Sequence, residues 1–312
     1  MMSINALVYL EHQVESFTVN DLQIAHLADE LPNIKFSKVT TEEEVESKLP
    51  DSDIFITWKF KSLWYSRATR LQAIFTPAAG NDWIDRDLNF PVPVLNGTFH
   101  GTIMAESLLG MILYFNRRFS QLQINQLAKR YDRNVESPTP LLRGQHVLII
   151  GYGKIGKTVA GILKTFNCKI TGVKRTILES DKTHADLLIT PEQLIECIGD
   201  ADHVIAILPN DKSTDDMITA DHFKAMKRSA FFYNIGRGNC YKESVITEAL
   251  EKGLLAGAAL DVFEKEPLPR ESKLWEMPNV FIMPHASAIC KEYLDTYFNE
   301  LITKINELNL PH

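Results

Sequence analysis

Short apolar segments alternate with helical patterns along the chain. Apolar runs bounded by polar or turn-forming residues are typical of strands buried in a parallel sheet. In the N-terminal part they predict strands at Ala6–Leu10, Lys35–Val39, Asp53–Thr57, Leu71–Phe75 and Val92–Leu95. Farther along they predict strands at Val147–Ile150, Ile170–Val173, Val204–Leu208, Ala230–Ile235, Ala258–Val262 and Val280–Met283. The chain therefore carries two successive sets of predicted strands.

Helices are predicted between many of these strands. Thr18 and Asp21 form a capping-box pattern at the start of a helix over Asn20–Leu31. Two further helices are expected to start at Thr41 and at Thr190. Residues 101–134 and 292–308 also show a helical pattern. Alternating strands and helices predict an α/β fold with right-handed crossovers. We expect two doubly wound parallel-sheet domains, of which the first is a small flavodoxin-like unit.

Composition narrows the class of protein. A chain of 312 residues can form two domains with cores of their own. Its net charge of −7 argues against a general nucleic-acid binder. No apolar run approaches the roughly 20 residues that cross a bilayer, and the N-terminus does not resemble a signal peptide. The four cysteines are scattered without metal-ligand spacing, so we expect a cytoplasmic protein without a metal.

A glycine loop follows the apolar run 147–150. Gly151, Gly153 and Gly156 have the G-x-G-x-x-G spacing, and helical periodicity continues after them. The first glycine allows a sharp turn, the second lets a pyrophosphate approach the backbone, and the third lets the helix pack close to its strand. The helix N-terminus would offer N–H groups and a positive dipole end to the phosphates. This context favours a dinucleotide site over a purely structural turn.

Three side chains with suitable chemistry follow later strands. Arg237 stands in a Gly-Arg-Gly turn, Glu266 lies in the loop after 258–262, and His285 follows Pro284. Ligands in such sheets bind at the carboxyl ends of the strands. A guanidinium can hold a carboxylate with two hydrogen bonds, a histidine can exchange a proton near neutral pH, and an acid can orient that histidine. The trio suits hydride exchange at a 2-oxo or 2-hydroxy acid.

Each of these residues also has a simpler interpretation. Arg237 could be a surface residue of a glycine turn, and His285 a loop histidine with ordinary partners. Glu266 lies in a charged loop, where a solvated acid is the default. Asp261, at the end of its strand, could cap a turn or contact the nicotinamide end of a cofactor.

The chain resembles the D-isomer-specific 2-hydroxyacid dehydrogenase family over almost its whole length. The motifs that carry the resemblance are Ala78-Ala-Gly-Asn-Asp82, Ala105-Glu106, Gly151-Tyr-Gly-Lys-Ile-Gly156, Leu208-Pro209, Asn234-Ile-Gly-Arg-Gly238, Ala259-Leu-Asp-Val-Phe-Glu-Lys-Glu-Pro-Leu268 and Met283-Pro-His-Ala286. The resemblance implies a substrate domain formed by residues 1–100 with 286–312, and a Rossmann cofactor domain over 101–285. It also implies a homodimer whose arm covers about 101–140.

The resemblance assigns roles to residues. Arg237 would clamp the substrate, His285 would be the acid/base and Glu266 its partner. Ala79 and Gly80 would bind the substrate carboxylate through their backbone. The implied cofactor contacts are Gly151, Gly153, Lys154, Ile155, Gly156, Leu208, Pro209, Ile235, Gly236 and Asp261.

The chain departs from the common family pattern at the second strand of the cofactor domain. An acid usually stands there, about 20 residues after the glycines, to bind the ribose hydroxyls. Here Lys174, Arg175 and Thr176 occupy that place. Two cations and a hydroxyl would hold a 2′-phosphate, so we expect NADP, with NAD still possible. The alternative is a solvent-exposed basic turn. Arg175-Thr176 is similar to the glyoxylate and hydroxypyruvate reductase branch, which prefers NADPH.

These observations predict an NADPH-dependent reductase that converts a small 2-oxo acid to the D-2-hydroxy acid. Substrate choice is expected near Trp58, Lys59, Phe60 and Ala78–Asn81. Trp58 could contact the substrate or serve only as a core aromatic. Alternative functions are an NAD-dependent D-2-hydroxyacid or phosphoglycerate dehydrogenase, or a dinucleotide-sensing protein similar to a corepressor. A formate or phosphite dehydrogenase would carry extra motifs that this sequence lacks.

Overall fold

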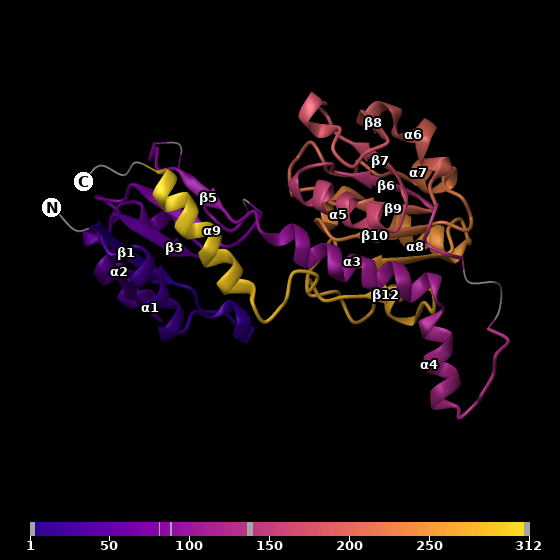
Figure 1. Cartoon of the computed structure of the whole chain (residues 1–312), viewed down its shortest axis with the longest axis horizontal. Helices are drawn as coiled ribbons and strands as arrows, with labels where there is room; N and C mark the ends of the chain where they lie inside the picture. Colours follow the sequence, from indigo (N-terminus) through magenta and orange to yellow (C-terminus); the bar gives the residue numbers. More distant parts are fainter. Residues whose placement is uncertain (1–3, 81, 88, 136–139, 309–312) are drawn as a thin grey trace. The chain divides into compact units, whose positions relative to one another are not determined.

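The chain folds into two α/β units, as its alternating pattern predicts. The computed structural model describes residues 4–80, 82–87, 89–135 and 140–308. Unit 1 comprises Met1–His100 and Ile289–His312, and unit 2 comprises Gly101–Ala288 (Figure 1). Each unit contains one parallel sheet, which confirms the expected fold class. Within the described residues, no helix has the length and apolar character needed to cross a membrane.

Unit 1 has a five-stranded sheet with the order β2-β1-β3-β4-β5. Its strands are β1 (Ile4–Tyr9), β2 (Ile34–Lys38), β3 (Ile54–Thr57), β4 (Ala73–Thr76) and β5 (Val94–Asn96). Its helices include α1 (Asp21–Glu30), α2 (Glu42–Lys48) and α9 (Tyr293–Glu307). The order is that of flavodoxin-like sheets, in which the chain changes direction between β1 and β3. The strands lie within a few residues of their predicted positions.

The start of α1 differs from the prediction. Its cap is Asn20, whose Oδ1 accepts a hydrogen bond from the Gln23 backbone N–H at 2.9 Å, while the Gln23 side chain accepts from Asn20 N–H at 3.1 Å. The Thr18 hydroxyl instead donates to the carbonyl of His12 at 2.9 Å, closing the loop after β1. Asn20 takes the cap because it directly precedes the first helical residue. The cap expected at Thr41 is present in α2.

Unit 2 has a seven-stranded sheet with the order β12-β11-β10-β9-β6-β7-β8. The strands are β6 (His146–Ile150), β7 (Lys169–Val173), β8 (Leu187–Ile189), β9 (His203–Ala206), β10 (Phe231–Asn234), β11 (Gly257–Leu260) and β12 (Val280–Ile282). The helices are α3 (His100–Asn116), α4 (Phe119–Leu127), α5 (Lys154–Thr165), α6 (Leu194–Cys197), α7 (Ala220–Ala225) and α8 (Glu243–Glu251). β8, a short strand at the sheet edge, was not among the predicted strands.

The sheet of unit 2 is buried on both faces. Leu148 and Ile150 of β6 pack in a core that includes residues of α7 and α8. Val147 and Ile149 point to the opposite face, where residues of α3 and α5 pack. This alternation explains why every residue of β6 is buried. The strand that leads into the glycine loop is therefore held rigidly from both sides.

Candidate active site

The glycine loop joins β6 to α5. Gly151 has φ of +99°, and a Cβ there would lie 2.3 Å from the Ile207 carbonyl oxygen, so only glycine fits. A Cβ on Gly156 would lie 2.6 Å from the carbonyl oxygen of Gly151, which explains the close approach of helix and strand. Gly153 differs, because a Cβ there would meet no described atom within 4 Å. Of the three glycines of the loop, only Gly153 has free space at the position that a Cβ would occupy.

The free space beside Gly153 is suited to the phosphates of a dinucleotide. Gly153 is the N-cap of α5 and is solvent-exposed. No side chain in the described part of the chain caps this helix start. Backbone N–H groups at an uncapped helix N-terminus favour bound phosphate oxygens. The predicted contacts Lys154 and Ile155 begin the same helix.

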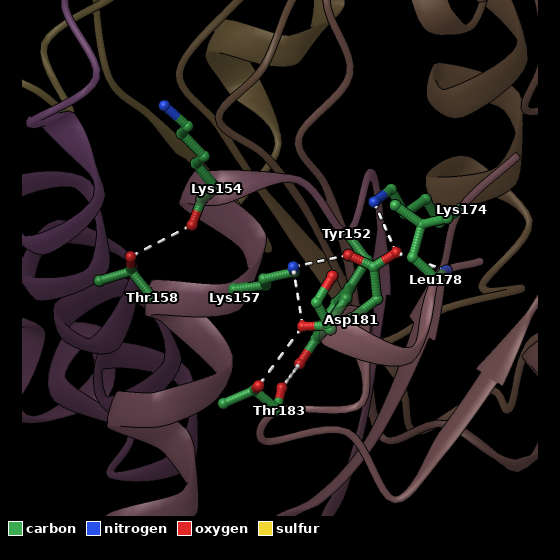
Figure 2. A network of polar contacts seen from close by, with 9 residues as sticks. Tyr152, Lys154, Lys157, Thr158, Lys174, Leu178, Asp181 and Thr183 are labelled. Atoms are coloured by element: carbon green, nitrogen blue, oxygen red, sulfur yellow. Dashed lines mark hydrogen bonds and ion pairs between the residues drawn. The ribbon is translucent and has the colours of Figure 1, made fainter. Parts of the chain in front are cut away.

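Tyr152, between the first two glycines, supports the loop from inside. Its side chain is fully buried, and its hydroxyl donates to the Thr183 carbonyl at 2.6 Å (Figure 2). Burial, together with the nearby charges of Asp181 and Asp186, raises the pKa of Tyr152 to about 12. Its ring lies 2.6 Å from where a Cβ on Gly172 would be, so β7 needs a glycine at that position. Sequence reasoning gave Tyr152 no role.

A buried carboxylate organises the end of β7. Asp181 is 1% exposed, and its oxygens lie 2.6 Å from Lys157 Nζ and 2.7 Å from Lys174 Nζ (Figure 2). These two lysines and the Leu178 N–H hold the pKa of Asp181 well below its usual range. The charge of Lys174 is therefore partly neutralised by Asp181. No role was predicted for this acid from the sequence.

The two residues after Lys174 are exposed. Arg175 donates from Nη1 to the Ser213 hydroxyl at 2.8 Å. Thr176 is exposed beside it. Ser213 belongs to the loop after β9, which also contains the predicted contacts Leu208 and Pro209. The end of β7 and the loop after β9 are thus joined through Arg175.

Arg237 is fixed by glycines on both sides. A Cβ on Gly236 would lie 2.5 Å from Leu208 N, and one on Gly238 would lie 2.0 Å from the Phe263 carbonyl carbon. The turn therefore packs directly against the loops that follow β9 and β11. Its half-buried arginine donates from Nη1 to the Gly236 carbonyl at 3.0 Å.

Asn234, the last residue of β10, shapes this turn and was missed by sequence reasoning. Its side-chain amide donates to the Arg237 carbonyl at 3.0 Å and accepts from the Gly236 N–H at 3.0 Å. The residue is fully buried. An amide at the end of an apolar strand was the available signal, because a buried amide needs partners nearby. Ile235, a predicted cofactor contact, is buried in the same turn.

His285 and Glu266 form a pair at the carboxyl edge of the same sheet. His285 Nδ1 lies 2.8 Å from Glu266 Oε2, and the two side chains are 41% and 37% exposed. The other carboxylate oxygen accepts from the Phe263 N–H at 3.1 Å. Burial alone would raise the pKa of Glu266, but His285, the Phe263 N–H and the charge of Arg237 lower it overall. The turn that carries Arg237 lies beside this pair, because Gly238 packs against Phe263 and Glu266 binds the N–H of the same phenylalanine.

Asp261 holds the loop that carries His285. Its carboxylate accepts from the N–H of Ala286 at 2.6 Å and from the Ser287 hydroxyl at 2.5 Å, and it is 1% exposed. Its carbonyl accepts from the His285 N–H at 2.8 Å. His285 needs this support because its φ is +52°, an uncommon backbone conformation for a residue with a side chain. These contacts point to a positioning role for Asp261, and a cofactor contact stays a prediction.

Unit 1 places its predicted residues at the carboxyl edge of its own sheet. Trp58 follows β3, and its indole N–H donates to the Phe17 carbonyl at 3.0 Å. Ala79 is exposed in the turn after β4. The Asn96 side chain donates to the Gly80 carbonyl at 2.8 Å and holds that turn, a role that sequence reasoning missed. The predicted segment Ala78–Asn81 ends outside the described residues, at Asn81.

Comparisons with known proteins agree with this geometry. The family model described as D-isomer specific 2-hydroxyacid dehydrogenase, NAD binding domain, matches residues 109–287. Glyoxylate/hydroxypyruvate reductase B of Enterobacter sp. (strain 638) is 32% identical over 247 residues, which cover 77% of this chain and 74% of the relative.

Two solved structures are similar over nearly the full length. A D-isomer specific 2-hydroxyacid dehydrogenase family protein from Aeromonas salmonicida has a TM-score of 0.81 at 28% identity, covering 99% of this chain and 98% of that one. The NADPH-dependent glyoxylate/hydroxypyruvate reductase of Sinorhizobium meliloti, in complex with NADP and sulfate, has a TM-score of 0.79 at 26% identity, covering 99% and 96%. The chain therefore belongs to the D-isomer specific 2-hydroxyacid dehydrogenase family of NAD(P)-dependent oxidoreductases.

Proposed function

We propose that this enzyme uses NADPH to reduce a small 2-oxo acid, of the glyoxylate or hydroxypyruvate type, to the D-2-hydroxy acid. The observation that carries the proposal is the 2.8 Å contact between His285 and Glu266 beside Arg237. The relatives described as glyoxylate/hydroxypyruvate reductases support the substrate type. We also propose a cytoplasmic location, because the scattered cysteines suit a reducing compartment.

His285 supplies the proton in the proposed reaction. Glu266 engages Nδ1, which leaves Nε2 to donate a proton to the substrate carbonyl oxygen. The ionised Glu266 stabilises the charged imidazolium before the transfer. Arg237 binds the substrate carboxylate and polarises the carbonyl group. Bound NADPH would supply the hydride to C2.

Trp58, Ala79 and Gly80 are also proposed as substrate-binding residues. The turn at Ala79 and Gly80, in which Ala79 is exposed, would donate backbone N–H groups to the carboxylate, and the Asn96 side chain would hold that turn in place. Trp58 would border the carbon chain of the substrate. Its bond to Phe17 fixes the indole ring, so the boundary would be rigid.

A matrix of substrates and cofactors tests the proposal. Glyoxylate, hydroxypyruvate and pyruvate are each assayed with NADPH and NADH, and the product's stereochemistry is determined. We expect turnover of glyoxylate or hydroxypyruvate, with NADPH preferred. Preference for NADH together with slow reduction of these acids would favour an NAD-dependent D-2-hydroxyacid or phosphoglycerate dehydrogenase. Absence of turnover with every 2-oxo acid, despite dinucleotide binding, would favour the sensor alternative.

Arg175 is the residue on which the NADPH preference mainly depends, because the charge of Lys174 is shared with Asp181. Arg175→Ala removes a charge-assisted contact worth about 1.5–3 kcal/mol. We expect KM for NADPH to rise by about ten- to a hundredfold, while KM for NADH stays unchanged. Arg228→Ala, at another exposed arginine of unit 2, is the matched control. An equal effect of Arg175→Ala on both cofactors would contradict the assignment.

The helix α4 supports the proposed homodimer. It projects away from the rest of unit 2 (Figure 1). Four apolar side chains on it are exposed. These are Phe119, Leu122, Ile124 and Leu127. Such exposed apolar area on one helix favours burial against a second copy of the chain. Of the proposed arm 101–140, residues 136–139 lie outside the described residues.

Leu127→Asp is expected to weaken the dimer, because Leu127 is 79% exposed and would be buried only by a partner. Light scattering should give twice the mass of one chain for the wild type and a shift toward the monomer for the variant. Leu22→Asp is the control, since Leu22 is similarly exposed, at 83%, but lies on α1. A monomeric wild type at micromolar concentration would contradict the proposal.

A further inference from the structure

The loop 174–178, which directly follows β7, is closed by one oxygen of Asp181. Asp181 Oδ2 accepts a hydrogen bond from Lys174 Nζ at 2.7 Å and another from the Leu178 N–H at 2.8 Å (Figure 2). The first and last residues of the loop are therefore bound to the same atom. Between them lies the exposed Arg175, for which a contact with a 2′-phosphate is predicted.

The other oxygen of Asp181 joins this loop to α5. Asp181 Oδ1 lies 2.6 Å from Lys157 Nζ (Figure 2). Lys157 lies in the first turn of α5, the helix whose N-cap is Gly153. A single carboxylate thus connects the loop after β7 with the helix at whose start the phosphates of a dinucleotide are expected.

Asp181 is too deeply buried to meet a ligand itself. Its side chain is 1% exposed, whereas those of Lys157 and Lys174 are each 29% exposed. A free carboxylate beside a 2′-phosphate would repel it, but both oxygens of Asp181 are bound to ammonium groups, which offset its charge. We therefore expect any effect of Asp181 on a bound dinucleotide to come through the groups that it holds.

A loop that is already fixed favours a ligand that uses it. An unrestrained loop would have to be ordered when the ligand binds, and the lost conformational freedom would weaken binding. Asp181 restrains the loop 174–178 on one side. On the other side Arg175 Nη1 donates to the Ser213 hydroxyl at 2.8 Å, and the Ser213 N–H donates to Asp211 Oδ1 at 2.8 Å. The guanidinium is thus positioned before any cofactor arrives.

We infer that Asp181 is a positioning residue for cofactor selection, which holds the loop 174–178 against α5 in the conformation that binds the 2′-phosphate of NADPH. This inference rests on the proposed preference for NADPH and deepens it. A negative charge near a phosphate site would by itself oppose NADPH, but here it keeps two lysines and the loop in place. NADH carries no phosphate at that position, so its binding depends less on the loop.

Asp181→Asn tests this inference in binding titrations. The amide offers one acceptor oxygen to three donors, and its NH₂ group would face an ammonium group. We expect Kd for NADPH to rise about ten- to a hundredfold and Kd for NADH to rise at most about threefold. Adenosine 2′,5′-bisphosphate should lose affinity as NADPH does, because it carries the 2′-phosphate without the nicotinamide. In the enzyme without ligand, the amides of residues 175–178 should exchange hydrogen faster.

Asp186→Asn is the matched control, because Asp186 joins the same helix and strand at their other ends. Its carboxylate lies 2.6 Å from Lys164 Nζ, in the last turn of α5, and accepts from the Ile170 N–H of β7 at 2.7 Å. This variant should lower the Tm but leave the ratio of the two Kd values unchanged. A loss of stability alone therefore does not reproduce the result expected for Asp181→Asn.

Lys157→Met removes only the bond between Asp181 and α5, so it tests the inference even if Asp181→Asn does not fold. We expect Kd for NADPH to rise at least about threefold more than Kd for NADH. If Lys157 acted only by binding the phosphates that both cofactors share, the two Kd values would rise equally. That equal rise would contradict the inference.

The result for Asp181→Asn has two further outcomes that would overturn the inference. An unchanged ratio of the two Kd values would mean that the carboxylate has no part in cofactor selection. Tighter binding of NADPH would mean that Asp181 acts by repulsion and does not position the loop. If the wild-type enzyme bound NADH as tightly as NADPH, the proposed cofactor preference itself would be wrong.

Discussion

His285→Ala is expected to lower kcat for the 2-oxo acid by about 10²–10⁴, while the Kd for NADPH should stay unchanged. The reason is that Nδ1 is held by Glu266 at 2.8 Å, so the variant loses both the proton donor and the orientation of that donor. The adenosine and phosphate groups of the dinucleotide are expected at the glycine loop and at the end of β7, so most of its binding contacts do not involve the imidazole ring. Steady-state kinetics and a fluorescence titration of NADPH measure the two quantities separately.

The control for this variant is His26→Ala, at an exposed histidine of α1, for which wild-type kinetics are expected. Wild-type kcat in His285→Ala would exclude the assigned role. A loss of NADPH binding equal to the loss of kcat would show instead that the loop had collapsed. That loop is held independently by Asp261, whose contacts run to the backbone of Ala286 and to Ser287, so we expect it to keep its shape.

Glu266→Gln tests whether Glu266 acts through its hydrogen bond to His285 or through its negative charge. The amide can still accept from the imidazole, but it no longer stabilises the imidazolium. The pKa of Glu266 lies below its ordinary value, so the carboxylate is ionised throughout the neutral range and this stabilisation is present there. We therefore expect the alkaline limb of the kcat/KM profile for reduction to move to lower pH. An unchanged profile would mean that the charge of Glu266 has no part in the proton transfer.

Most strands, and the places of Arg237 and His285 after two of them, could be predicted because their signals are local. An apolar run such as Val147–Ile150 is buried on both faces wherever helices cover the sheet, so its sequence alone indicates a strand. Arg237 and His285 directly follow such runs, and the carboxyl ends of parallel strands share one edge. Glu266 was ambiguous by itself because acids in charged loops are usually solvated, and the structure shows its bond to His285.

Residues whose partners are distant in the sequence could not be predicted in the same way. Asp181 lies in a polar stretch and has the sequence context of a surface acid, yet it is buried between Lys157 and Lys174. Tyr152 stands at the first x of the G-x-G-x-x-G pattern, which specifies no residue type there, and only the fold places its ring against Gly172. Buried polar groups must be paired, but a single sequence does not identify the partner.

Gly153→Ala is expected to weaken the binding of NADPH without destabilising the fold. A Cβ at this position meets no described atom within 4 Å, so the protein itself can accommodate it. Its φ of −87° is open to any residue, so the backbone is not strained either. The added methyl group would occupy the space through which a pyrophosphate approaches the backbone. An overpacked contact costs about 1–3 kcal/mol, which corresponds to about a five- to 150-fold rise in Kd.

Gly151→Ala is the contrasting variant, because its Cβ would lie 2.3 Å from the Ile207 carbonyl oxygen at a φ of +99°. Backbone strain and overpacking there should together lower the free energy of unfolding by roughly 2–6 kcal/mol. Thermal unfolding without ligand and titration with NADPH therefore distinguish the two variants. Gly153→Ala should keep the wild-type Tm and bind NADPH more weakly, whereas Gly151→Ala should have a lower Tm. If Gly153→Ala bound NADPH like the wild type, the phosphates would have to lie elsewhere than at the start of α5, since this is the position at which the loop is open.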